Sequence, residues 1–125
     1  MKSISPNIFV NDLAETITFY TKLGFSVIHE VTTSEGEKVF AMMTKESVTF
    51  LFQTFASIEG KLPMVHRADG GSLLLYVSMQ NIREYYEQVR KQVNVLTGLE
   101  KTFYGATEFS ICDNNNYLLT FAEHD

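Results

Sequence analysis

The chain has 125 residues, 45% of them hydrophobic and ten of them phenylalanine. That composition excludes a disordered chain and is enough for one compact core. A net charge of −5 disfavours nucleic acid as a partner, because neutralising phosphates requires a basic surface.

The chain opens with a predicted strand over residues 4–10 and a predicted helix over residues 12–23. Asn11 and Asp12 can each cap this helix by accepting hydrogen bonds from its free amide groups. Glu15 lies three residues after Asp12 and completes a pattern similar to a capping box. A glycine directly after residue 23 is expected to end the helix.

The remaining elements follow from alternating apolar residues, which indicate strands, and from one further amphipathic stretch. Glycine and proline mark residues 55–71 as a linker, which could hold one short helical turn. In chain order we expect strands at 25–32, 38–44, 47–54, 72–79, 93–102, 107–113 and 117–123, and a second helix at 81–91.

The second half of the chain repeats the first at an offset of 69 residues. The offset matches Leu13 to Ile82, Phe40 to Phe109, Met42 to Ile111, Phe50 to Leu119 and Phe52 to Phe121. We therefore predict one βαβββ unit used twice, as modules 1–54 and 72–125 of a single domain. Two unrelated amphipathic helices in an α+β domain are the alternative.

Targeting and redox features predict a cytoplasmic protein. No apolar run reaches the length of a membrane span, and the opening MKSISPN lacks the apolar region of a secretory signal, so we expect no membrane partner. The single cysteine, Cys112, permits no disulfide within the chain. We interpret Cys112 as a small core residue rather than a nucleophile, because no histidine lies near it in sequence.

Two stretches carry a resemblance to a known family, NIFVNDLAETITFYTKLGF near the start and TEFSICDNNNYLLTFAE near the end. With them, nearly the whole chain resembles the glyoxalase/bleomycin-resistance family of the vicinal oxygen chelate superfamily. The second stretch keeps the first residue of the family's usual Asp-Pro-Asp-Gly turn, Asp113, but not its Pro and Gly. The resemblance implies an α+β fold with two βαβββ modules, a curved mixed sheet around a cavity, helices outside, and a homodimer.

The alternation of the strands agrees with a sheet covered on one face. One apolar set is expected to lie under the helices: Ile8, Val10, Phe50, Phe52, Leu75, Val77, Leu119 and Phe121. The opposite face mixes aromatic and polar residues, as a small-molecule cavity requires. A partly solvated sheet face or a dimer surface remains the alternative.

Metalloenzymes of this family hold one divalent metal through four side chains, usually histidine and glutamate. The matching positions here are Ser5, Leu51, Leu74 and Thr120. Leucine has no donor atom and hydroxyl groups are poor ligands for transition metals, so we expect no metal and no cofactor. We interpret the three histidines, His29, His66 and His124, as ordinary surface or structural residues. Relocated ligands, such as His66 with Glu108, remain an alternative.

The resulting hypothesis is a metal-free small-molecule-binding protein, most similar to the bleomycin-resistance branch. Such a protein could sequester an antibiotic or an aromatic or cationic metabolite, with aromatic rings that stack on planar groups. Glu108 could pair with a cation or be an ordinary residue of a surface strand. The candidate ligand-binding residues are Asn7, Phe9, Leu51, Gln53, Tyr76, Phe103, Tyr104, Glu108 and Thr120.

Two other classes of function remain open. A glyoxalase- or dioxygenase-type lyase or oxidoreductase, or a fosfomycin-transferase type, requires relocated metal ligands. A metal-free enzyme could use Glu108 as general base, with Tyr76 or Tyr104 as hydrogen-bond donor. A dimeric interaction module whose cavity holds no ligand is the third hypothesis.

Overall fold

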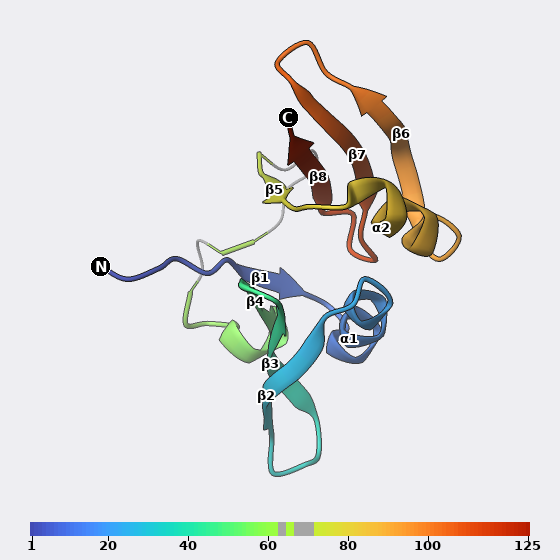
Figure 1. Ribbon diagram of the computed structural model, residues 1–125. Coiled ribbons are helices and arrows are strands. Elements are labelled where there is room, and N and C mark those ends of the chain that lie inside the picture. Colours follow the sequence, from blue (N-terminus) through green and yellow to red (C-terminus); the bar gives the residue numbers. More distant parts are fainter. Residues whose placement is uncertain (63–64, 67–71) are drawn as a thin grey trace. The chain divides into compact units, whose positions relative to one another are not determined.

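The computed structural model describes residues 1–62, 65–66 and 72–125 (Figure 1). The chain divides into two compact units, unit 1 over Met1–Ala68 and unit 2 over Asp69–Asp125. Unit 1 contains β1 (Asn7–Val10), α1 (Leu13–Lys22), β2 (Ser26–Thr32), β3 (Lys38–Lys45), β4 (Val48–Thr54) and the 3₁₀ turn η1 (Ala56–Ile58). Unit 2 contains β5 (Leu74–Ser78), α2 (Ile82–Val89), β6 (Asn94–Lys101), β7 (Ala106–Cys112) and β8 (Leu118–His124).

Each unit forms one four-stranded mixed sheet. The strand order is β1-β4-β3-β2 in unit 1 and β5-β8-β7-β6 in unit 2. The first strand of each module pairs in parallel with the last, and the other pairs are antiparallel. The predicted α+β fold of two βαβββ modules is confirmed.

Local sequence signals define both ends of α1. The Asp12 carboxylate accepts a hydrogen bond from the Glu15 amide at 3.0 Å, which satisfies one of the free donors of the first turn. At the other end, Gly24 adopts a φ of +101°, and the Phe25 amide donates to the Tyr20 carbonyl at 3.0 Å. This is a Schellman ending, which favours glycine because a Cβ is strained there. Neither α1 nor α2, the α-helices of the described residues, has the length and apolar run needed to cross a membrane.

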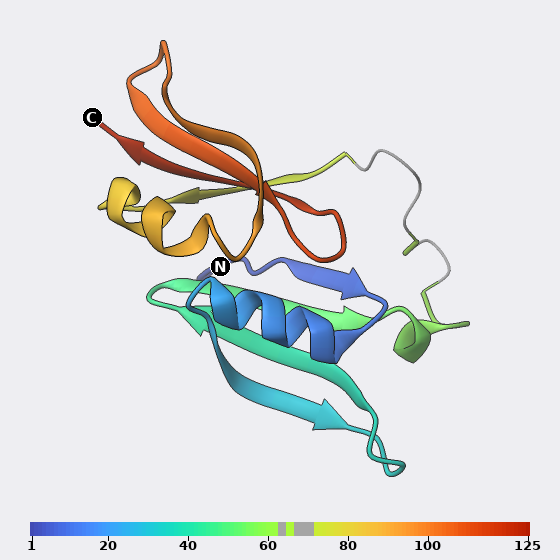
Figure 2. The same cartoon turned by 90° about the vertical axis from the view of Figure 1, so that its right-hand side faces the viewer.

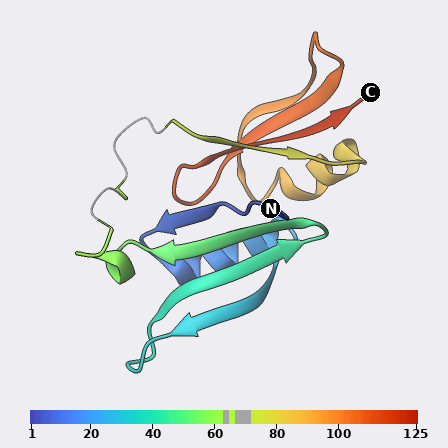
Figure 3. The same ribbon diagram turned by 90° about the vertical axis from the view of Figure 1, so that its left-hand side faces the viewer.

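The core of unit 1 is aromatic and lies between α1 and one face of its sheet. Tyr20 on α1 is fully buried, and its ring centroid lies 4.6 Å from that of Phe52 and 5.7 Å from that of Phe50. Burying each such side chain stabilises the fold by roughly 1.5–3 kcal/mol. Figure 2 shows α1 along this face, and Figure 3 shows the opposite face, with the strands in front of the helix.

The core of unit 2 repeats this arrangement. Phe109 and Phe121 stack with ring centroids 5.1 Å apart, and Tyr85 of α2 meets Phe121 edge-on at 5.3 Å. Tyr85 corresponds to Thr16 by the 69-residue offset, and both are buried. The sequence patterns had not placed either residue in the core.

The repeat holds residue by residue in the parallel strand pairs. Asn7 pairs with Leu51 in unit 1, and Tyr76 pairs with Thr120 at the same offset in unit 2. The antiparallel pairing of the last two strands differs in register by one residue between the units. Phe52 faces Ala41, whereas Phe121, its equivalent at the 69-residue offset, faces Phe109.

The predicted matches of Phe40 to Phe109 and of Met42 to Ile111 are therefore wrong by one position. The buried residues of β3 are Ala41 and Met43, and these correspond to Phe109 and Ile111. The reason is turn length. Two residues separate β3 from β4, but five separate β7 from β8, where the Asp113 carboxylate accepts hydrogen bonds from two amides of the turn.

Candidate functional site

The sheet of unit 2 has one face that α2 does not cover. Leu119 and Phe121 point from β8 into the core with α2, so the residues that alternate with them point the other way. Strand pairing brings Tyr76 of β5 and Glu108 of β7 onto this second face. We call it the open face of unit 2.

Four side chains form a hydrogen-bonded cluster on the open face. The Tyr76 hydroxyl donates to Glu108 Oε2 at 2.8 Å, and the Tyr104 hydroxyl donates to the same oxygen. His124 Nε2 lies 3.0 Å from the Tyr76 hydroxyl. We refer to Tyr76, Tyr104, Glu108 and His124 as the tyrosine–glutamate cluster.

The shared carboxylate changes the acidity of both phenols. The hydrogen bond to Glu108, followed by desolvation and the charge of that carboxylate, raises the pKa of Tyr76 to about 12. The same hydrogen bond is the largest cause of the raised pKa of Tyr104. Loss of either proton would place a phenolate beside a carboxylate, which is unfavourable. Both tyrosines therefore keep their protons at neutral pH, and both act as donors.

Access to the cluster is open in the chain as described. Tyr76 is 46% exposed and Tyr104 is 51% exposed, while Glu108 is half-buried. Phe103 is fully exposed, and its ring meets that of Tyr104 edge-on at 5.1 Å. An exposed aromatic pair beside a half-buried carboxylate can bind a planar molecule.

Thr120 takes a different place from the one expected. It lies on β8 between Tyr76 and Ser110 in the paired strands, but only 6% of it is exposed. Its hydroxyl shares a hydrogen bond of 2.8 Å with that of Ser110. The Thr120 hydroxyl therefore supports the sheet under the cluster.

The four candidate residues of unit 1 form a separate group on the face of its sheet opposite α1. The side-chain amide of Asn7 donates a hydrogen bond to Gln53 Oε1 at 3.1 Å. Leu51, the strand partner of Asn7, is half-buried. Phe9 lies beside Phe55, with ring centroids 5.9 Å apart. This group offers one amide pair and an aromatic edge.

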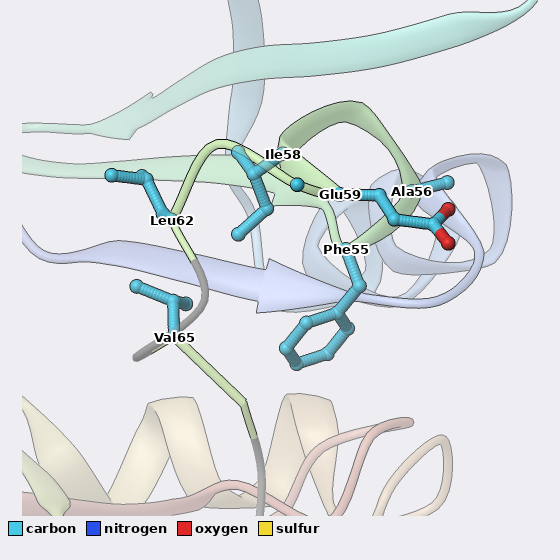
Figure 4. Close-up of a pocket in the computed structure, with 7 residues that line it drawn as sticks. Phe55, Ala56, Ile58, Glu59, Leu62 and Val65 are labelled. Atoms are coloured by element: carbon cyan, nitrogen blue, oxygen red, sulfur yellow. The ribbon is translucent and has the colours of Figure 1, made fainter.

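A cavity of about 310 Å³ opens beside Phe55, between η1 and the residues that follow it. Phe55, Ile58, Leu62 and Val65 are its apolar lining, and Figure 4 shows the Glu59 carboxylate on the side away from Leu62 and Val65. Its volume is at the lower limit for small-molecule pockets. The sequence reasoning did not identify this cavity, because residues 55–71 carry no periodic pattern.

A second cavity, of about 520 Å³, lies at the start of α2 and has charges of both signs. Arg83, Lys101 and Glu123 line it. The Glu123 carboxylate already accepts a hydrogen bond from the Ile82 amide at 2.9 Å, and Lys101 pairs with Asp125. Glu123 thus caps the helix start, and Lys101 is paired with the last residue of the sequence.

His124 is the cluster residue that the sequence reasoning missed, because it was interpreted as an ordinary residue near the chain end. The signal was present in the alternation of β8. His124 is four residues beyond Thr120 and so lies on the same face of the strand. Alternation through the last strand residue would have placed it beside Tyr76.

The residues at the family's metal positions do not fit a divalent metal. These positions hold Ser5, Leu51, Leu74 and Thr120. The two leucines carry no lone pair, and the Thr120 hydroxyl is buried in its hydrogen bond with Ser110. Among the residues described, no three His, Cys, Asp or Glu side chains come together in a metal-binding group.

Comparison with known proteins gives one family. A family model described as Glyoxalase/Bleomycin resistance protein/Dioxygenase superfamily matches residues 3–121. No curated protein sequence matches the chain.

Solved structures of similar fold cover nearly all of the chain. TioX from Micromonospora sp. ML1 is 13% identical with a TM-score of 0.76, over 98% of this chain and 99% of that one. A glyoxalase/bleomycin resistance protein/dioxygenase family enzyme from Burkholderia phytofirmans PsJN is 16% identical with a TM-score of 0.78, over 97% and 98%. A bleomycin-binding protein complexed with bleomycin is 16% identical with a TM-score of 0.68, over the full length of both chains. At such identities the similarity establishes the fold and leaves the ligand open.

Proposed function

The chain belongs to the glyoxalase/bleomycin resistance protein/dioxygenase superfamily, and on that premise we propose that it binds a small organic molecule without a metal. The observation that carries the proposal is the tyrosine–glutamate cluster on the open face of unit 2. A half-buried carboxylate held by two phenols, with exposed rings around it, has the polar and aromatic groups of a ligand site.

Aromatic stacking and charge define the kind of ligand. The exposed rings of Phe103 and Tyr104 offer faces and edges for a planar group, and Glu108 offers a negative charge. We therefore propose an aromatic or cationic metabolite, or an antibiotic that the protein sequesters. One solved structure of similar fold is a bleomycin-binding protein complexed with bleomycin, which agrees with this class.

The donor set supports binding without a metal. Two of the four family positions are leucine, and the hydroxyl of Thr120 is already paired. A lyase or oxidoreductase of the superfamily's metal-dependent kind needs a metal that polarises a carbonyl or oxygen species. The residues at these positions offer no donor set for such a step.

The remaining predicted ligand contacts stay part of the proposal. The amide pair of Asn7 and Gln53, together with Phe9 and Leu51, makes the open side of the first sheet a second candidate contact surface. Thr120 contributes beneath the cluster, through its hydrogen bond with Ser110.

A ligand screen with a matched variant tests the proposed function. Thermal melts in excess EDTA are recorded against planar cationic antibiotics and aromatic metabolites, for the native chain and for Tyr76→Ala. We expect hits with the native chain that Tyr76→Ala loses, with little loss of stability, because Tyr76 is 46% exposed. Ile28→Ala, at a residue that is 57% exposed in unit 1, is the control and should keep the hits.

Two outcomes of this screen would argue against the proposal. If Tyr76→Ala unfolds the chain, Tyr76 is a core residue and the open face is wrongly assigned. If the native chain gives no hit in EDTA but gains hits with a metal, the metal-dependent hypothesis is the better one.

We further propose a cytoplasmic homodimer with modules 1–54 and 72–125 joined by the linker 55–71. Support for the dimer comes from Leu73, Leu74 and Leu118, which are exposed together where β5 pairs with β8. Exposed apolar side chains of this kind favour an interface. The free thiol of Cys112 agrees with a reducing compartment. Sedimentation equilibrium tests the dimer, since one chain has a mass of 14.2 kDa.

A further inference from the structure

The tyrosine–glutamate cluster has already used its hydrogen-bond donors. A phenol carries one proton and an ionised carboxylate carries none. Both phenolic protons are directed to Glu108 Oε2. Tyr76 and Tyr104 therefore have no proton left for a ligand.

His124 has used one of its nitrogens in the same way. Because the Tyr76 proton lies on Glu108, the contact of 3.0 Å between His124 Nε2 and the Tyr76 hydroxyl requires Nε2 to be the donor. Hydrogen bonds therefore run in one direction, from His124 to Tyr76 to Glu108. The donor count thus places a proton on His124 Nε2.

The groups of Tyr104 and Glu108 that remain for a ligand are acceptors. None of the described residues donates to Glu108 Oε1, and the Tyr104 hydroxyl oxygen keeps lone pairs beside it. A ligand that accepts hydrogen bonds would meet only lone pairs at Glu108 Oε1 and at the Tyr104 oxygen. A ligand that donates two hydrogen bonds can reach the carboxylate and the phenol oxygen together.

The surrounding charges favour a cation. Glu100 of β6 lies directly opposite Glu108 of β7, and its charge contributes to the raised pKa of Tyr104. Like charges opposite each other in a sheet are destabilising, and a bound cation would relieve the repulsion. Lys101, the next residue after Glu100, cannot supply that cation while it pairs with Asp125.

We infer that the open face of unit 2 selects a planar nitrogen cation with at least two N–H groups, of the amidinium or guanidinium class, carried on an aromatic body. The N–H groups bind Glu108 Oε1 and the Tyr104 oxygen, and the aromatic body lies against Phe103 and Tyr104. This inference rests on the proposed function, because it names the ligand class of the same site.

Four small probes separate charge from hydrogen bonding. Benzamidine has both, benzyltrimethylammonium has the charge without N–H groups, benzamide has N–H groups without the charge, and benzoate has the opposite charge. Each is titrated calorimetrically into the native chain in EDTA. We expect benzamidine to bind at least tenfold more tightly than any of the other three.

Matched variants locate the effect. Glu108→Gln keeps the shape of the side chain and should weaken benzamidine binding at least tenfold, whereas Glu100→Gln should weaken it two- to fivefold. Glu87→Gln makes the same chemical change on the exposed side of α2, where Glu87 pairs with Arg90, and should leave the affinity unchanged. If Glu108→Gln fails to fold, Tyr104→Phe replaces it and should weaken binding two- to fivefold.

Several results would overturn the inference. Equal affinity for benzyltrimethylammonium would mean that the site recognises charge alone, and equal affinity for benzamide would mean that it recognises N–H groups alone. Absence of benzamidine binding at millimolar concentration, or unchanged affinity in Glu108→Gln, would also refute it. Neutral aromatic hits that Tyr76→Ala loses would then leave the proposed function standing, whereas no hit of any kind would remove both.

Discussion

The phenol of Tyr76 connects the candidate site to a measurable titration. Its pKa is raised from 10.0 to about 12 by the hydrogen bond to Glu108. Between pH 10 and 12 the unfolded chain releases this proton while the folded chain keeps it, so stability falls as pH rises through this interval. Below pH 10 the stabilising contribution is fully present.

We predict that ultraviolet absorbance at alkaline pH shows two shifted tyrosines in the folded protein. Tyr104 titrates above its usual range, and Tyr76 titrates near pH 12. In Glu108→Gln the charge of the acceptor is gone, so Tyr76 should titrate closer to 10. Urea unfolding from pH 9 to 12 should show a decline in stability that is smaller in the variant. If the two titration curves coincide, Tyr76 does not donate to Glu108 in solution.

For single residues, the sequence indicated which side chains belong to the candidate site but not which hydrogen bonds they form. Tyr76, Tyr104 and Glu108 were candidates from strand alternation and from a family resemblance, and they do come together. Alternation could not show that Tyr104, at the end of the β6–β7 turn, reaches back to Glu108. Side chains of a turn follow its backbone dihedral angles, and these have no period that a sequence pattern could display.

At the scale of elements, helix caps and glycine stops were the most reliable signals. The cap at Asp12 and the left-handed Gly24 lie where the sequence placed them. The second helix differs, because Asn81 makes no side-chain cap and Glu123 on β8 accepts from the Ile82 amide instead. A cap from 41 residues away is a tertiary contact, which local patterns cannot predict.

We predict that Asp12→Ala lowers the free energy of unfolding by about 1 kcal/mol, the usual value of a helix N-cap. Asp12→Asn keeps the accepting oxygen and should cost far less. Urea denaturation of the three proteins measures the difference. Equal losses in the two variants would mean that the charge of Asp12, and not its hydrogen bond to Glu15, stabilises the helix.

The repeat was predictable as a pattern but not in its full register. The 69-residue offset holds for the parallel pairs, where Asn7 and Tyr76 occupy equivalent positions. It changes to 68 in β7 because the turn from β7 to β8 is longer than the turn from β3 to β4. The sequence does not reveal this change of offset, because Phe40, Ala41, Met42 and Met43 are all apolar. Either offset therefore matches apolar residues with apolar residues.

At the scale of the whole molecule, the family match and the structural similarity agree on the fold. They leave the ligand open, because one fold serves many functions. The resemblance was visible in the sequence through its first helix and last strand. The proposed ligand site was not visible, because its side chains come together from three strands and a turn.

The predicted dimer can be tested at the same scale. Leu74 and Leu118 are paired across β5 and β8 and are both exposed. If they lie in an interface, Leu74→Asp should shift the mass in sedimentation from two chains towards one. Ile28→Asp, at an exposed apolar residue of unit 1, is the control and should leave the mass unchanged. A native chain that sediments as a monomer would contradict the dimer outright.

Metal content tests the central claim, binding without a metal, most directly. Elemental analysis of the purified protein by inductively coupled plasma mass spectrometry is combined with melts in added nickel, zinc, iron and manganese. With Ser5, Leu51, Leu74 and Thr120 at the family's ligand positions, we predict no stoichiometric metal and no stabilisation by any of these ions. About one equivalent of metal per chain, or a large rise in melting temperature with one of them, would contradict the claim.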